Sequence, residues 1–251
     1  REAGAPGDAT FALRDSAGVL TFAGQMIARY PAAPRATGSL RILEALHAAR
    51  GDSLAPGDEA LAAEVDRLRG RGELAAARLA RAASAKPEAG LHLRRARLLR
   101  DLRRFPEALA AVSAAAKVSE SSRDLVDGLL ERARIHRGWA EVSAGAVTTS
   151  LEISSAGNWG EEQAAFRAYA EAAKLEPPGA TETSWERARF QEERGAWKAA
   201  RTDYARVAAG AGDRSDPAAL RAGLMSLAAA EPAAALRWFS RGESEASRFW
   251  H

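Results

Sequence analysis

The sequence contains no cysteine, so disulfide bonds and thiolate metal sites are excluded and the redox compartment stays open. Aromatic residues make up only 6% of the chain although hydrophobic residues make up 47%, so alanine supplies much of the apolar content. Alanine is a strong helix former, and an interior rich in it indicates closely packed helices rather than a sheet. Isoleucine, valine and threonine are sparse, and no run of alternating apolar and polar residues predicts a strand.

Long hydrophobic runs are also missing from the sequence. No stretch reaches the roughly 18 consecutive apolar residues of a membrane-spanning helix, and no secretory leader opens the chain. Because the chain begins at Arg1 rather than methionine, we expect that a leader has been removed or that the sequence is part of a longer protein.

The charges nearly balance, with 36 lysines and arginines against 33 acidic residues and a net charge of +3. Arginine greatly outnumbers lysine, for which a GC-rich genome is the simplest explanation. Because the basic residues are spread along the chain and interleaved with glutamate and aspartate, we expect no nucleic-acid partner.

One short pattern returns five times: an alanine, a larger apolar residue four positions on, and a small residue three positions after that. Counted between the first alanines, the steps are 33, 57, 35 and 35 residues. A period of 33 to 35 residues predicts an all-α fold, an α-solenoid or superhelix of stacked antiparallel helical hairpins, in which each repeat packs on its neighbours. The copies are Ala75/Leu79/Ala82, Ala108/Val112/Ala115, Ala165/Tyr169/Ala172, Ala200/Tyr204/Val207 and Ala235/Phe239.

Turn residues and caps divide the chain into five predicted segments. Residues 1–14 form a flexible arm, 15–56 a degenerate first hairpin, 57–142 regular repeats, 143–158 an irregular segment, and 159–251 further repeats. The segment 143–158 is either an ordered insertion or a place where residues are missing, and the uncapped end at His251 suggests truncation. The predicted helices are 17–29, 39–49, 59–69, 73–85, 91–102, 106–117, 123–136, 161–175, 184–193, 196–209, 217–229 and 232–241, with a last one from 244.

The repeat resembles the tetratricopeptide repeat, whose second helix carries this small, large, small series. The stretch 70–87 matches best, with Gly70 at the turn and Pro87 closing the helix, while Gly72 stands where that family usually has an aromatic residue. Trp159 also lies out of register, so the individual repeats are degenerate. The resemblance implies a TPR-like scaffold that binds a protein or peptide.

A second resemblance covers the C-terminal third, which is similar to the superhelical region of bacterial soluble lytic murein transglycosylases. It rests on residues 184–189, 195–197, 220–224, 233–239 and 245–251. In that family a helical superhelix precedes a lysozyme-like domain that cleaves peptidoglycan in the periplasm, so the resemblance implies a periplasmic location, although a cytoplasmic one stays possible.

The catalytic domain of that family is not visible in this sequence. Its glutamate lies in a Glu-Ser pair upstream of a Gly-Leu-Met-Gln stretch. Here Gly223, Leu224 and Met225 are followed by Ser226, and the pair Glu243 and Ser244 comes after them instead of before. We therefore read residues 223–226 as part of a repeat helix.

No other pattern predicts catalysis, a cofactor or a metal, so we assign no catalytic, cofactor-binding or metal-binding residue. The four histidines, His47, His92, His136 and His251, lack a ligand partner at helical spacing. Glutamates followed three residues later by arginine, such as Glu131 before Arg134 and Glu186 before Arg189, are interpreted as ion pairs on solvated helix faces.

Six tryptophans could line a binding groove. Trp185, Trp197 and Trp238 fall at repeat positions that pack helix on helix, so we expect them to pack. Trp139 and Trp159 flank the irregular segment and are the candidates for a partner surface.

Three functions follow from these observations. The first is a noncatalytic TPR-like scaffold for protein–protein interaction, in a bacterial envelope. The second is the noncatalytic superhelical region of a lytic-transglycosylase-like enzyme, for which peptidoglycan is a possible partner. The third is an accessory subunit of a large assembly.

Overall fold

The computed structural model describes residues 16–49, 54–147, 159–177, 179–210 and 212–240. All regular elements in these ranges are α-helices. The predicted arm 1–14, residues 148–158 and the predicted helix from 244 lie outside the described residues. The helices are α2 (Ser16–Arg29), α3 (Pro34–Ala49), α4 (Pro56–Leu68), α5 (Gly72–Ala85), α6 (Ala89–Asp101), α7 (Phe105–Val118), α8 (Ser122–Val147), α9 (Trp159–Leu175), α10 (Glu182–Glu193), α11 (Trp197–Ala208), α12 (Ser215–Ala228) and α13 (Pro232–Phe239).

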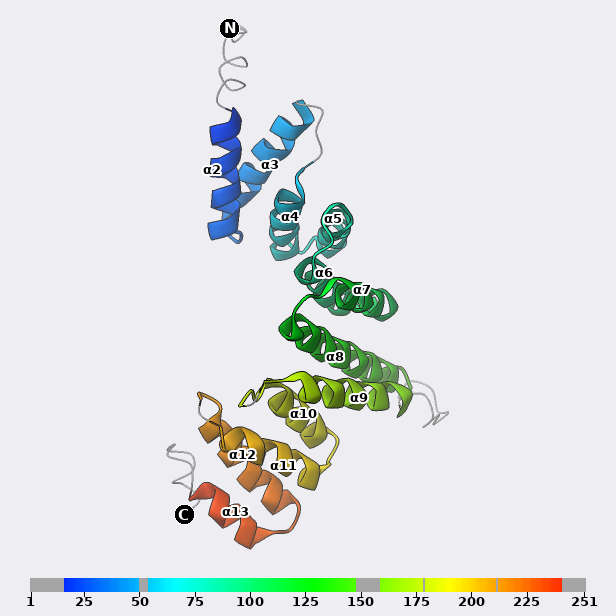
Figure 1. The fold of residues 1–251 in the computed structure, drawn as a ribbon, viewed down its shortest axis with the longest axis vertical. Helices are drawn as coiled ribbons and strands as arrows, with labels where there is room; N and C mark the ends of the chain where they lie inside the picture. The colour runs from blue at the N-terminus through cyan, green and yellow to red at the C-terminus, as the bar shows by residue number, and fades with distance from the viewer. Residues whose placement is uncertain (1–15, 50–53, 148–158, 178, 211, 241–251) are drawn as a thin grey trace, which may run out of the picture. The chain divides into compact units, whose positions relative to one another are not determined.

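The chain divides into two compact units, Arg1–Ser119 and Glu120–His251. Unit 1 holds α2 to α7 and unit 2 holds α8 to α13. Within each unit consecutive helices pair as antiparallel hairpins, α2 with α3, α4 with α5 and α6 with α7, then α8 with α9, α10 with α11 and α12 with α13 (Figure 1). The boundary between the units falls inside the predicted run of repeats 57–142.

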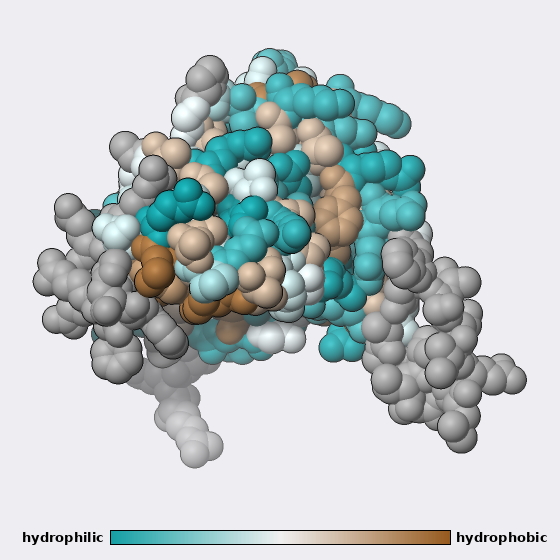
Figure 2. Space-filling view, turned by 90° about the horizontal axis from the view of Figure 1, so that it is seen from below, coloured by the Kyte–Doolittle hydropathy of each residue, from teal (hydrophilic) through white to brown (hydrophobic). Residues whose placement is uncertain are grey.

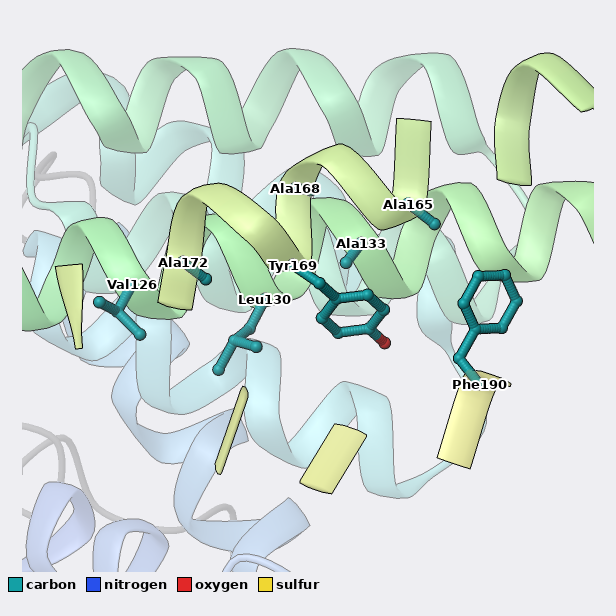
Figure 3. Close-up of a cluster of buried hydrophobic side chains, with 8 residues drawn as sticks. All are labelled: Val126, Leu130, Ala133, Ala165, Ala168, Tyr169, Ala172 and Phe190. Carbon is teal, nitrogen blue, oxygen red and sulfur yellow. The ribbon is translucent and has the colours of Figure 1, made fainter. Parts of the chain in front are cut away.

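The repeated small, large, small pattern lies on the second helix of the hairpins, α5, α7, α9, α11 and α13. Every residue of the pattern is buried, with no more than 4% of its surface exposed. Figure 3 shows one copy, in which Ala165, Tyr169 and Ala172 of α9 share a buried cluster with Leu130 of α8 and Phe190 of α10. The Tyr169 ring lies 6.3 Å from the ring of Phe190. The alanines allow the helices to approach closely and the ring fills the remaining space, which is why the spacing repeats.

Four of the turns inside hairpins share one backbone motif. The second residue after the first helix has a positive φ: +74° at Gly70, +59° at Arg103, +70° at Gly195 and +59° at Ala230. The next N–H donates to a carbonyl five residues back, for example from Arg71 to Asp66 at 2.8 Å. This hydrogen bond, which caps the helix end, is the Schellman motif. Glycine adopts this backbone at little cost, so the sequence signals two of these turns and not the other two.

Two helix limits differ from the sequence prediction by five residues or more, and the others differ by three or fewer. Helix α3 begins at Pro34 instead of at the predicted residue 39, because proline fits the first turn of a helix. Helix α8 continues to Val147 instead of ending at His136, so the first residues of the predicted irregular segment are helical.

Charged residues form part of the interior of unit 1. Arg78 on α5 is only 8% exposed and donates to Asp66 of α4 at 2.7 Å and Glu59 of α4 at 3.1 Å, and also to Glu44 of α3. Arg71 pairs with Asp66 at 2.6 Å. One guanidinium therefore joins three helices of two neighbouring hairpins.

A buried carboxylate also occurs in unit 2, where the sequence predicted a solvated one. Glu131 is completely buried in α8, and its carboxylate lies 3.5 Å from Arg134. Glu186 pairs with Arg134 at 3.2 Å, across the gap between α10 and α8, where a pair with Arg189 was expected. The spacing of three residues correctly predicted that Glu131 lies beside Arg134, but the exposure of Glu131 depends on the neighbouring helices.

The α12–α13 end of unit 2 exposes apolar side chains, visible as brown areas on a mostly hydrophilic surface in Figure 2. Leu224, Leu227 and Leu236 are 36%, 41% and 55% exposed. No described helix is both long and apolar enough to cross a membrane. The preceding repeat, 35 residues earlier, has charged residues at the corresponding positions, namely Arg189, Glu192 and Arg201. The three leucines therefore stand where the preceding repeat is charged.

Candidate functional site

A pocket of about 440 Å³ opens in unit 1 between α4 and α6, the first helices of two neighbouring hairpins. Its floor is apolar, formed by Ala63 of α4, Leu79 of α5 and Leu98 of α6, each no more than 6% exposed. These side chains belong to the buried core of unit 1, so the floor is part of the hydrophobic interior. Its rim is charged, with Glu64, Arg67, Arg94, Arg97, Arg100 and Asp101.

The rim arginines on α6 follow from their spacing in the sequence. Arg94, Arg97 and Arg100 stand three residues apart, so successive turns of α6 place them along one side of the helix. Arg94 donates to the backbone carbonyl of Ala60 in α4 at 3.0 Å. This bond fixes the side chain across the space between the two helices.

The opposite side of the rim is an ion pair on α4. Arg67 donates to Glu64 through two nitrogens, at 2.9 Å and 2.6 Å. This hydrogen bonding lowers the pKa of the Glu64 carboxyl below its ordinary value, against a smaller opposing effect of burial. On α6, Arg100 donates to Asp101 at 3.0 Å. Both carboxylates of the rim therefore already have arginine partners.

The pocket has an excess of positive charge, because four arginines and two carboxylates line it. The first helices of unit 2 differ in this respect, since arginines of α8 and α12 pair with glutamates of α10. These pairs are Arg134 with Glu186 at 3.2 Å, Arg137 with Glu193 at 2.6 Å and Arg221 with Glu192 at 2.7 Å. In unit 2, glutamates therefore neutralise the arginines that lie between the first helices of neighbouring hairpins. In unit 1, Arg94 instead donates to an uncharged backbone carbonyl of the neighbouring first helix.

The two predicted partner-binding residues belong to unit 2. Trp139 is partly buried in α8, and Trp159 is the first residue of α9, with a side chain outside the described set. A hydrogen bond of 2.5 Å between His136 of α8 and Glu161 in the first turn of α9 links the two helices. Trp139 and Trp159 thus belong to two helices that pack on each other, and their role in binding stays a prediction.

The tryptophans expected to pack are only partly confirmed. Trp185 packs edge-on against Tyr204 at 5.5 Å, and Trp238 packs against the core of unit 2. Trp197 is 36% exposed, so the expectation that it packs is wrong. It follows the turn at Gly195 and lies at the rim of its hairpin.

Sequence reasoning missed the pocket arginines because it attributed arginine to genome composition. The available signal was local: α6 carries Arg94, Arg95, Arg97 and Arg100 with Asp101 as its sole acidic residue.

No group of three or more metal-ligating side chains occurs in the described part of the chain.

No family model matches the sequence, and no curated protein matches it. Among solved structures, PilF of Pseudomonas aeruginosa is similar to this chain, with a TM-score of 0.54 and 15% identity over 91% of this chain and 90% of that one. At this identity the likeness shows the fold. The chain has the predicted all-α fold, an α-solenoid of stacked hairpins of the tetratricopeptide-like type.

Proposed function

We propose that the protein is a noncatalytic TPR-like scaffold for protein–protein interaction, and that a segment of its partner binds in the arginine-lined pocket of unit 1. The observation that carries this proposal is the pocket itself, with an apolar floor and polar groups at its rim. Its volume of about 440 Å³ lies within the range of ligand pockets. A short peptide segment can place an apolar side chain on the floor and polar groups against the rim.

The chemistry of the rim suits binding better than catalysis. A general acid needs a pKa near the working pH, but Arg67 lowers the pKa of Glu64 further from that range. The other rim carboxylate, on Asp101, pairs with Arg100. Arginine stays protonated and acts as a hydrogen-bond donor and a fixed charge. These groups can hold a partner in place and are poorly suited to move protons.

The finer parts of the proposal rest on the sequence. A bacterial envelope location and a link to lytic transglycosylases come from the resemblance of the C-terminal third. An accessory role in a large assembly fits the same fold. These alternatives predict different partners, so one binding experiment separates them.

The test is affinity capture from a bacterial envelope extract with three baits. Asp101→Trp fills the pocket with a bulky ring while keeping all four arginines. Ser113→Trp adds the same ring on an exposed position of α7, away from the pocket. We expect wild type and Ser113→Trp to capture the same protein and Asp101→Trp to lose it.

Equal capture by all three baits would contradict the pocket as the binding site. A parallel sedimentation assay with peptidoglycan sacculi tests the transglycosylase alternative. Sedimentation of the protein with sacculi, without any captured protein, would favour that alternative over the scaffold.

A further inference from the structure

We propose that the pocket of unit 1 selects an acidic peptide segment, whose carboxylates meet the rim arginines while an apolar side chain covers Leu79 and Leu98. This inference rests on the proposed function and adds the chemical class of the partner. Neither net charge nor composition indicates it, because the whole chain has a net charge of only +3.

The local charge points to an acidic partner. The two rim carboxylates are already paired with Arg67 and Arg100. The rim as a whole keeps two more positive than negative charges, since four arginines face two carboxylates. A pocket with walls of low polarity concentrates such a field, which attracts anions and disfavours lysine or arginine in the partner.

The arginines are also held in position before a partner arrives. Arg94 is anchored to the carbonyl of Ala60, and Arg67 is anchored to Glu64. A guanidinium carries five N–H donors, and the bond from Arg94 to Ala60 occupies one of them. A carboxylate can accept hydrogen bonds from the others with less loss of side-chain freedom than free arginines would suffer.

The floor argues for a peptide over a nucleic acid. Single-stranded nucleic acids bind proteins through aromatic side chains on which the bases stack. The residues lining the pocket include no aromatic ring, and its floor is alanine and leucine. An aliphatic floor fits a leucine-like or valine-like side chain of a peptide.

The experiment is selection of short random peptides displayed on phage, with the full 251-residue chain as bait. Phage that also bind Asp101→Trp are removed, so that the enriched peptides depend on the pocket. We expect the enriched peptides to be rich in aspartate and glutamate, with an apolar residue beside the acidic ones.

A synthetic peptide of the enriched sequence then measures the role of charge. Arg97→Gln keeps the space of the pocket and removes one rim charge, whereas Lys117→Gln removes one charge from the exposed surface of α7. Arg97→Gln should weaken binding about two- to fivefold and high salt should weaken it further. Lys117→Gln should leave binding unchanged. Circular dichroism confirms that each variant is folded.

The remaining outcomes separate this inference from the proposed function. If pocket-dependent peptides are enriched but are neutral or basic, the scaffold stands and the acidic selection is wrong. If no pocket-dependent peptide is enriched, the proposed function itself is contradicted. A short single-stranded oligonucleotide that binds more tightly than the acidic peptide, and loses binding in Arg97→Gln, would overturn the peptide in favour of nucleic acid.

Discussion

Replacing Arg78 by methionine should destabilise unit 1 and leave unit 2 unchanged. Arg78 is 8% exposed and bonds to Asp66 and Glu59, which are 0% and 7% exposed. Methionine keeps most of the length of the side chain but leaves two buried carboxylates without their shared partner. Removing one member of a buried ion pair costs about 3–5 kcal/mol. Because Arg71 still pairs with Asp66, we expect the lower end of that range, about 3 kcal/mol.

The distribution of tryptophan supplies the assay. All six tryptophans of the chain follow residue 119, so their fluorescence reports on unit 2 alone, whereas circular dichroism reports on helices of both units. With a urea dependence of about 2 kcal/mol per molar, the loss should lower the midpoint of unit 1 by about 1.5 M. The fluorescence midpoint should not move.

A double variant tests the cause of this loss. Asp66→Asn removes the most buried carboxylate, so Arg78→Met together with Asp66→Asn should cost less than the sum of the two single changes. A shift of less than about 0.3 M in Arg78→Met, or additive losses in the double variant, would refute the reasoning.

Three further predictions concern unit 2. Gly223→Ala should lower its stability by about 2 kcal/mol, measured by tryptophan fluorescence in urea, because a Cβ there would overlap the ring of Phe239. Ala230→Gly should raise the stability of unit 2 by about 1 kcal/mol, because glycine adopts the left-handed backbone of this turn without strain. Gly195→Ala should lower it by a similar amount, and two variants as stable as wild type would contradict the turn assignment. Burial raises the pKa of Tyr169 to about 12, and burial also raises that of Tyr204. The Tyr169 contribution to stability is present below its unfolded pKa near 10 and is lost as the pH rises towards 12. Ultraviolet titration should therefore show these two tyrosines ionising together with the loss of helix.

The sequence predicted the fold because its strongest signal is local and repeated. Each alanine of the pattern, such as Ala75 or Ala165, is buried in the second helix of a hairpin. The turn at Gly70 was also predictable, since glycine marks a left-handed residue, whereas Arg103 adopts the same backbone without any sequence signal. Packing in the hairpin imposes that conformation, and propensity alone does not reveal it.

The pocket could not be predicted from the sequence because its parts come together only in three dimensions. Arg94 bonds to Ala60, 34 residues earlier, so the anchoring of the rim depends on how two hairpins stack. Glu131 gives the same lesson in unit 2, because its spacing from Arg134 suggests a surface pair although the residue is completely buried. Helical periodicity shows which residues share a face, but only the neighbouring helices decide whether that face is exposed.

The most direct test of the binding site is photocrosslinking from within the pocket. A small aliphatic diazirine side chain in place of Asp101 lies at the rim without filling the pocket, and the same group in place of Ser113 lies on the exposed surface of α7. Each labelled protein is irradiated with the captured partner or with the selected acidic peptide. The account predicts a crosslinked product from the group at Asp101 and little from the group at Ser113. Equal yields from both positions, or a product from Ser113 alone, would contradict a partner-binding pocket between α4 and α6.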